Sequence, residues 1–260
     1  MKITTDISIT SRRRRAVSEW SPLQLFAQGG VGGWYDASVT GCLWQDVAGT
    51  VPATEGTPVA RIDDLSGNGY HCIQPTLAAR PTFVIDPQGR PCLEFDGVDD
   101  LLQAPFALDH RDATLALGFL TTVSDENGGV PFGVGTHSTG RFYLQTSFGN
   151  TRFLRQPQNG ASLSVFGTPA DIRQVALARI GPGPDGFLAR SNGAAIDWAG
   201  SNAQQMSLAG RHIQIGARLP GSGHSAMRFY AGLYLMQALS DAALEQTEAF
   251  LAHKLGVVLP

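Results

Sequence analysis

The chain has 260 residues, of which 43% are hydrophobic and 16% are charged, and its formal net charge is −3 at pH 7. This apolar content supports a folded core and excludes a disordered chain, while the weakly acidic balance argues against nucleic acid as the main ligand. The 31 glycines and 15 prolines suit many short strands joined by tight turns, and all-β sandwiches of this length are often single domains.

The N-terminal segment differs in charge from the rest of the chain. Lys2 and the run Arg12 to Arg15 stand against one acidic residue, Asp6. The segment has no apolar core of signal-peptide length, and no run in the chain reaches the roughly 20 apolar residues that cross a bilayer. We expect a soluble protein made in the cytoplasm without a signal peptide. Residues 1–33 are predicted to be an extended arm with a glycine-rich flexible joint, and residues 34–260 the folded body.

Short apolar or aromatic runs bounded by Gly, Pro, Asp or Asn follow along the body, as is typical of strands and hairpins. In one of them Leu93 and Phe95 alternate with Glu94 and Asp96, so the apolar pair can face a core. The expected strands are 34–36, 43–46, 60–62, 82–85, 91–96, 114–121, 141–146, 152–155, 174–180, 186–190, 212–217 and 228–236. Their spacing predicts an all-β fold, a jelly-roll β-sandwich of two antiparallel sheets.

One amphipathic helix is predicted near the C-terminus, from the N-cap Ser240 to the terminating Gly256. An apolar stripe is predicted to pack on the sandwich, and it consists of Leu244, Thr247, Leu251 and Leu255. The polar residues expected to point elsewhere are Glu245, Glu248 and Lys254.

Several strings in the body occur in the order found in the concanavalin A-like lectin/glucanase superfamily. They are Trp34-Tyr35-Asp36-Ala37-Ser38, Asp64-Leu65-Ser66-Gly67-Asn68-Gly69-Tyr70-His71, Ala79-Arg80-Pro81-Thr82 and Leu93-Glu94-Phe95-Asp96-Gly97-Val98-Asp99-Asp100. Together with Ile213-Gln214-Ile215-Gly216 and Phe229-Tyr230-Ala231-Gly232 they resemble laminin-G-like domains of bacterial surface proteins and of phage or phage-related particles. The resemblance is weakest between residues 120 and 200.

The first half of the second string has the beginning of a calcium loop. Asp64, Ser66 and Asn68 place oxygen atoms at alternating positions before a glycine, but Pro75 stands where a later acidic ligand is expected. The same residues also suit turns in which the side chains cap their own backbone. Calcium therefore stays an alternative, and we expect no other cofactor.

Glu94 and Asp96 approximate the paired carboxylates of the superfamily's β-glucanases, in which strand alternation puts a nucleophile and an acid on one face. Gly97 is expected to bend the strand, and the same string occurs in the non-catalytic modules that the chain resembles. We expect no catalytic residues, and a glycoside hydrolase using Glu94 and Asp96 is the alternative.

Aromatic rings that could stack on sugars, with carboxylates nearby for the hydroxyls, are the candidates for a binding site. We select Trp198 with Asp197, Trp44 and Tyr143.

The sequence therefore predicts a carbohydrate-binding adhesion module, a fibre or spike on the surface of a virion or phage-like particle, that binds host cell-surface polysaccharide. The arm would join it to other particle proteins, and repeated copies in a homo-oligomer would strengthen weak sugar binding. We expect neither nucleic acid nor a membrane as partner. A purely structural decoration or assembly protein is the third alternative.

Overall fold

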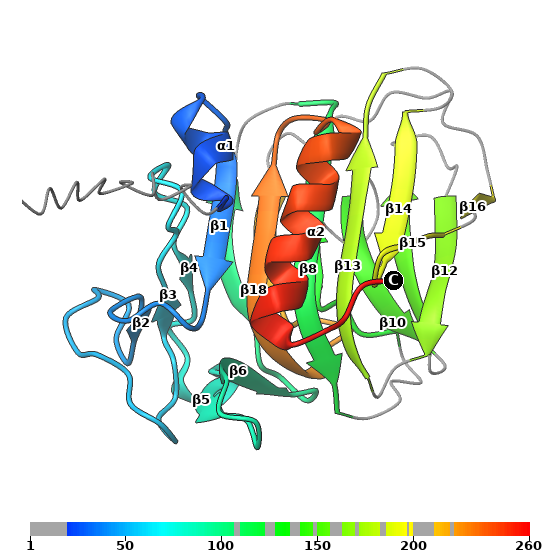
Figure 1. Ribbon diagram of the computed structural model, residues 1–260. Helices are drawn as coiled ribbons and strands as arrows, with labels where there is room; N and C mark the ends of the chain where they lie inside the picture. The colour runs from blue at the N-terminus through cyan, green and yellow to red at the C-terminus, as the bar shows by residue number, and fades with distance from the viewer. Residues whose placement is uncertain are drawn as a thin grey trace, which may run out of the picture.

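The computed structural model describes residues 20–106, 110–122, 128–135, 141–147, 150–156, 163–169, 172–182, 186–196, 198–199, 211–218 and 221–260. Two antiparallel sheets are stacked face to face, and one long helix near the C-terminus, α2 (Asp241–Leu255), lies across the outer face of one of them (Figure 1). The predicted fold class, an all-β sandwich with a C-terminal helix, is confirmed. The predicted N-terminal arm before residue 20 lies outside the described residues.

Sheet A is the sheet that carries α2. Its strands run in the order β15-β14-β13-β8-β18-β6-β5, and β1 also pairs with β18. Their bounds are β1 Gly32–Asp36, β5 Thr82–Ile85, β6 Pro91–Asp96, β8 Ala113–Thr121, β13 Arg173–Ile180, β14 Phe187–Ser191, β15 Ala194–Ala195 and β18 Ala226–Leu235.

Sheet B forms the other layer, in the order β16-β12-β11-β10-β9-β17-β7-β4-β3-β2. Its bounds are β2 Leu43–Trp44, β3 Arg61–Ile62, β4 Cys72–Ile73, β7 Leu102–Phe106, β9 Phe132–Val134, β10 Arg141–Ser147, β11 Asn150–Gln156, β12 Leu163–Pro169, β16 Trp198–Ala199 and β17 Arg211–Ile215. A short 3-10 helix, η1 (Leu77–Ala79), precedes β5.

Strand alternation divides the apolar residues between two cores. Side chains such as Leu117, Phe119 and Phe229 of sheet A meet Phe132 and Phe142 of sheet B between the sheets. The alternate residues of the same sheet A strands pack under α2, and they include Ala116, Val175, Leu177, Ala231 and Leu233. Sheet A is therefore buried on both faces along most of its length, which is why β8, β13 and β18 are almost continuously apolar.

The segment before the predicted boundary at residue 33 has more structure than the expected flexible joint. Residues Leu23–Ala27 form the short helix α1, in which Phe26 is buried. Gly32 is already part of β1, and a side chain there would collide with the backbone of Tyr234 in β18. The close approach of two strands explains this glycine better than flexibility does. The division of the chain at residue 33 stays a prediction.

Helix α2 begins and ends where the sequence predicts. The Ser240 hydroxyl accepts a hydrogen bond from the Ala243 N–H, and Gly256 has a left-handed φ of 64°. The predicted apolar stripe is buried against sheet A. None of the helices in the described part of the chain combines the length and apolar content needed to span a bilayer.

The prediction that Glu248 points away from the sandwich was wrong, because the side chain is only 1% exposed. Its carboxylate accepts hydrogen bonds from Arg190 Nε at 2.8 Å and from the Gly193 N–H at 2.6 Å. Arg190 in turn donates from Nη2 to the Gly193 carbonyl oxygen at 2.8 Å. This buried ion pair fixes α2 to the hairpin between β14 and β15.

We predict that Glu248→Ala lowers the free energy of unfolding by about 3 kcal/mol, because it removes the buried carboxylate that pairs with Arg190 and leaves the Gly193 N–H without its acceptor. Glu245→Ala, on the exposed side of the same helix, should change it by less than about 0.5 kcal/mol. Urea denaturation followed by circular dichroism measures both. Equal effects would show that the buried pair does not stabilise the helix.

Candidate functional site

One continuous row of residues crosses the outer face of sheet B. Strand pairing aligns its members side by side, and in order they are Trp44, Arg61, Ile73, Gln103, Gln214, Gly133 and Tyr143. Their neighbours along the strands, such as Leu43, Ile62 and Leu102, belong to the core between the sheets. Two predicted binding residues, Trp44 and Tyr143, therefore stand on the same face at opposite ends of this outer row.

Asp63 organises the Trp44 end of the outer row. Its carboxylate accepts a hydrogen bond from Trp44 Nε1 at 2.8 Å and pairs with Arg61 Nε at 2.6 Å. His71 Nδ1 lies 3.0 Å from the same carboxylate. The side chains of Arg61, Asp63 and His71 are 21%, 20% and 35% exposed, so they are held in place and still reach water. We call Trp44, Arg61, Asp63 and His71 the Asp63 cluster.

The side chains at the other end of the outer row are buried and do not reach solvent. Tyr143 and Gln214 are each 1% exposed, so the expectation that the Tyr143 ring faces a ligand is not met in this structure. Gln103 Oε1 and His212 Nδ1 are buried on this face without a hydrogen-bond partner in the described part of the chain. Burial lowers the pKa of His212, which favours its neutral form. The open part of the row therefore runs from Trp44 to Gln103.

The remaining predicted sugar contacts stay predictions. Asp197 lies outside the described residues. Trp198 begins β16 and pairs with Val165 of β12, but its side chain lies outside the described part.

The predicted calcium loop is held together by its own hydrogen bonds. The Asp64 carboxylate accepts from the N–H groups of Trp34, Ser66 and Tyr70 and from the Ser66 hydroxyl, at 2.8 to 3.0 Å. Asn68 donates from Nδ2 to the carbonyl oxygens of Gly30 and Gly32. These donors use the lone pairs that an ion would need, and they favour the interpretation in which the three side chains cap turns and join the loop to β1. Calcium binding here stays a prediction.

Glu94 and Asp96 each have a partner other than the other carboxylate. Both lie on the helix side of sheet A, where Glu94 pairs with Arg228 across the strands at 2.7 Å. Asp96 ends β6, and its carboxylate caps the following turn through the N–H groups of Val98 and Asp99. Each carboxylate thus has a structural partner of its own.

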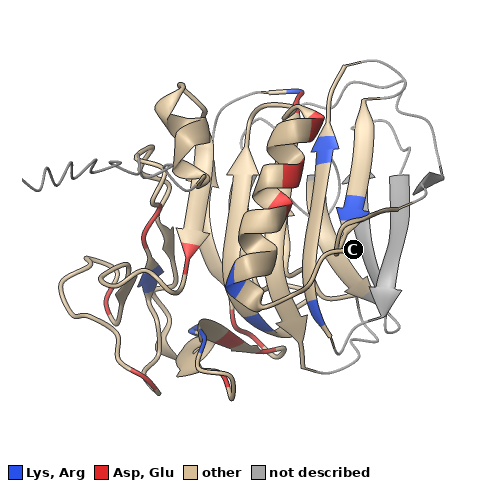
Figure 2. Ribbon diagram, in the orientation of Figure 1, with Lys and Arg blue, Asp and Glu red and all other residues tan. Residues whose placement is uncertain are grey.

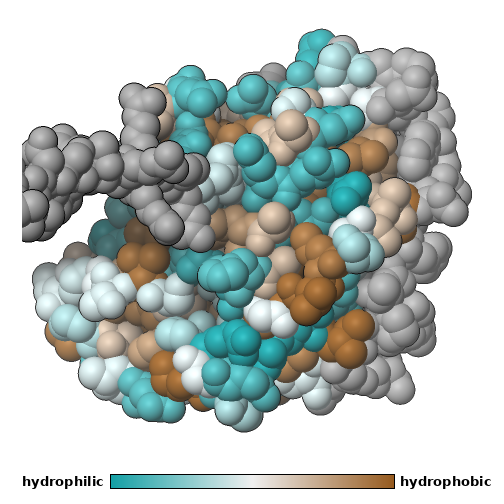
Figure 3. All heavy atoms as spheres, viewed as in Figure 1, coloured by the Kyte–Doolittle hydropathy of each residue, from teal (hydrophilic) through white to brown (hydrophobic). Residues whose placement is uncertain are grey.

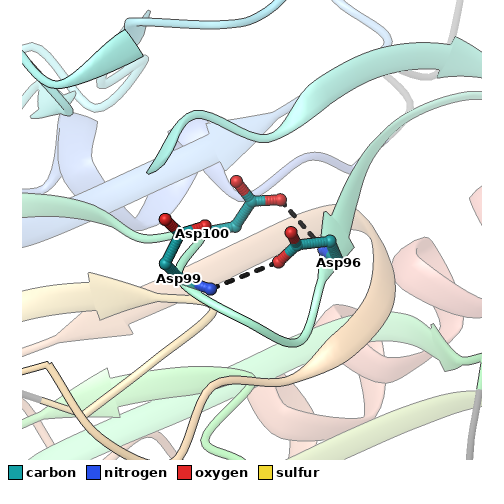
Figure 4. Close-up of side chains that lie close together, drawn as sticks. All are labelled: Asp96, Asp99 and Asp100. Carbon is teal, nitrogen blue, oxygen red and sulfur yellow. Dashed lines mark hydrogen bonds between the residues drawn. The ribbon is translucent and has the colours of Figure 1, made fainter. Parts of the chain in front are cut away.

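A turn with three carboxylates follows β6 (Figure 4). Asp96, Asp99 and Asp100 each offer an oxygen atom within 4.8 Å of the others. Asp100 Oδ2 accepts from the Asp96 N–H at 2.9 Å, and Asp100 is the one member that is buried. Burial, together with the charges of Asp96 and Asp99, raises the pKa of Asp100 to about 6. Hard cations prefer such oxygen ligands, but the internal hydrogen bonds already explain the arrangement.

Comparison with known proteins identifies the fold. No family model matches the chain, and no curated protein matches it in sequence. The binding domain of Paraclostridial Mosquitocidal Protein 1 is similar, with a TM-score of 0.55 at 13% identity, over 76% of this chain and 51% of that one. A Trypanosoma rangeli sialidase in complex with 2,3-difluoro-KDN has a TM-score of 0.54 at 13% identity, over 87% and 33%.

The ligand-binding domain of botulinum neurotoxin serotype D, in complex with N-acetylneuraminic acid, is also similar. Its TM-score is 0.50 at 10% identity, and the match covers 74% of this chain and 48% of that one. The chain thus spans about half or less of the length of these three proteins. At such identities the likeness shows a shared β-sandwich fold, and it agrees with the lectin-like fold that the sequence predicts.

We predict that the Asp100 carboxyl contributes stability that is lost as the pH rises from about 4 to about 6, because its pKa is higher in the folded chain than its ordinary value of 3.8. In this window Asp100 binds fewer protons in the unfolded chain than in the folded chain, so this group gives the free energy of unfolding a negative slope against pH. Asp100→Asn keeps an acceptor for the Asp96 N–H, so it should flatten this slope and stabilise the protein by about 1 kcal/mol at pH 7. Thermal unfolding across the pH range measures it, and an unchanged slope would contradict the assignment.

Proposed function

We propose that this protein is a carbohydrate-binding module and that the open part of the outer row, with the Asp63 cluster, is its sugar-binding surface. The carrying observation is the indole of Trp44, partly exposed and fixed through Nε1 to Asp63. An aromatic face held in one orientation suits the C–H face of a pyranose at little cost in side-chain entropy. Arg61, Asp63 and His71 place donors and acceptors for hydroxyl groups beside it.

The shape of this surface favours an extended sugar chain. The open row from Trp44 to Gln103 crosses four strands, which at the usual strand spacing extends about 14 Å. Ile73, between them, gives it an apolar middle. A shallow strip of this kind contacts several units of a polysaccharide along one side. The sugar-bound neurotoxin domain that shares this fold supports the proposal.

The finer proposal is a role in attachment. We propose that the module is displayed on a phage-like particle as part of a fibre or spike and binds host cell-surface polysaccharide. The basic residues before residue 16, in a chain that is acidic overall, support a docking role for the arm on an acidic neighbouring protein. Several copies in a homo-oligomer would raise the effective concentration of a weak single site.

Trp44→Ala should weaken polysaccharide binding about tenfold, the result of losing about 1.4 kcal/mol of stacking. Trp44→Phe keeps an aromatic face but loses the hydrogen bond to Asp63, so a loss of only two- to threefold is expected. Trp20→Ala is the matched control, because Trp20 packs against Phe250 of α2, far from the outer row. Glycan-array screening followed by calorimetry on the full chain measures all three. Equal losses for Trp44→Ala and Trp20→Ala would refute the surface.

The bound polysaccharide should keep its length. Because Glu94 is paired with Arg228 and Asp96 caps a turn, neither wild-type protein nor Glu94→Gln is expected to shorten the chains in size-exclusion chromatography. Breakdown by wild type that Glu94→Gln abolishes would establish the hydrolase instead. Incorporation into particles without binding to any glycan would establish a structural role.

A further inference from the structure

Helix α2 covers only part of the outer face of sheet A, and a groove opens beyond its C-terminal end. A cavity of about 430 Å³ lies between the end of the helix at Gly256 and Val257, the sheet residues Arg173 and Arg228, and the loop at Gln88. We call it the arginine groove. In the ribbon of Figure 2, basic residue positions lie near this end of α2 and acidic positions lie on its N-terminal half. Figure 3 shows hydrophobic and hydrophilic side chains intermixed over the same face.

Strand pairing sets the floor of the groove. Leu120 of β8 stands directly opposite Arg228 of β18 on one side and Arg173 of β13 on the other. The two arginines are thus two strand spacings apart, about 10 Å between their Cα atoms, with an apolar residue between them. Ile172, which is 49% exposed, and Val257 extend the apolar lining. The base of the groove is therefore apolar, and a guanidinium group lies on each side of it.

The two arginines are held differently. Arg173 donates from Nη1 to the Leu255 carbonyl oxygen at 3.3 Å, and its Nη2 lies 3.4 Å from Asp86. Arg228 uses only Nε, toward Glu94, and its two Nη atoms have no hydrogen-bond partner in the described part of the chain. Its side chain is 26% exposed. Arg228 is thus oriented by Glu94 and still has donors for a ligand.

Positive charge exceeds negative charge around the groove. A third arginine, Arg90, lies against Gly256 at the rim, and its Nη1 is buried without a partner among the described residues. In the described part of the chain, the ion pairs of Arg173 and Arg228 are formed with two carboxylates, Asp86 and Glu94. One of them, Asp86, is buried and already accepts a hydrogen bond from the Tyr230 hydroxyl at 2.9 Å. Glu94, the other, is 40% exposed and is the direct competitor of an anionic ligand for Arg228.

We propose that the arginine groove is a second binding site, specific for a carboxylate-bearing sugar such as a hexuronate unit of an acidic polysaccharide. The carboxylate pairs with the free Nη atoms of Arg228, and the C–H face of the ring lies on Leu120 and Ile172. The identity of this ligand rests on the proposed function, since it would be another unit of the same polysaccharide. The site itself is separate from the outer row, because the two lie on the outer faces of different sheets.

The test titrates the full chain with methyl β-D-glucuronide, with its methyl ester, with methyl β-D-glucoside and with the 6-sulfate of that glucoside, by NMR. We expect the glucuronide to bind at least tenfold more tightly than the ester and the neutral glucoside, and more tightly than the sulfate. No binding of the glucuronide, equal binding of the neutral sugar, or a preference for the sulfate would overturn the proposal.

Three variants locate the binding. Arg228→Gln should weaken glucuronide binding at least tenfold, whereas Glu94→Gln should strengthen it two- to fivefold by removing the competing carboxylate. Arg179→Gln is the matched control. Arg179 lies on the same face of sheet A as Arg228, but near the N-terminal end of α2. Its side chain is about as exposed as that of Arg228, and it forms an ion pair with Asp241 at 2.6 Å. A loss in the control as large as in Arg228→Gln, or no gain in Glu94→Gln, would exclude this groove.

The same titrations separate the two sites. Trp44→Ala should leave glucuronide binding unchanged, and Arg228→Gln should leave the binding of neutral polysaccharide unchanged. Should Arg228→Gln not fold, the gain expected for Glu94→Gln still decides the matter. Wild-type protein that binds the glucuronide but no neutral polysaccharide would count against the outer row alone. Wild-type protein that binds a neutral polysaccharide but not the glucuronide would count against the groove alone.

Discussion

The structure depends on one strand, β18, that is buried along most of its length. It pairs with β8 along one edge and with β6 and β1 along the other, so its backbone hydrogen bonds are satisfied within the sheet. Alternate side chains of the strand enter the core against sheet B or the core under α2. Because both faces must be apolar, binding chemistry is confined to places where this cover ends.

The two proposed binding surfaces follow from that constraint. Sheet B is covered on its inner face, so its outer face is free to carry the Asp63 cluster and the open row of side chains beside it. Sheet A is accessible beyond the last turn of α2, and there the register of β18, β8 and β13 places Arg228, Leu120 and Arg173 side by side. An extended acidic polysaccharide could meet both kinds of chemistry, stacking at one surface and charge pairing at the other.

Several carboxylates in this chain have a structural role, because they form hydrogen bonds or ion pairs within the protein. Asp64 joins its loop to β1 by a hydrogen bond, and Glu248 joins α2 to the hairpin between β14 and β15. Glu94 orients Arg228 through an ion pair. Each has a hydrogen-bond partner within the protein, as expected above all for Asp64 and Glu248, which are buried. Residue types that resemble catalytic or metal-binding patterns in the sequence thus have another explanation. The guanidinium of Arg228, in contrast, is partly exposed and keeps donors that have no partner in the described part of the chain.

The sequence alone determined the features that depend on local chemistry. The alternation in residues 91–96 gave a strand with those bounds, and Ser240 and Gly256 gave the ends of α2, because caps and strand periodicity act over a few residues. Strands β7 and β9 escaped prediction because Pro105 and Gly133 interrupt their patterns. Only the tertiary structure decided that Glu248 is buried, that Gly32 is packed against Tyr234, and that Tyr143 is closed off. The groove likewise depends on register between strands more than 50 residues apart in the chain, which no local pattern encodes.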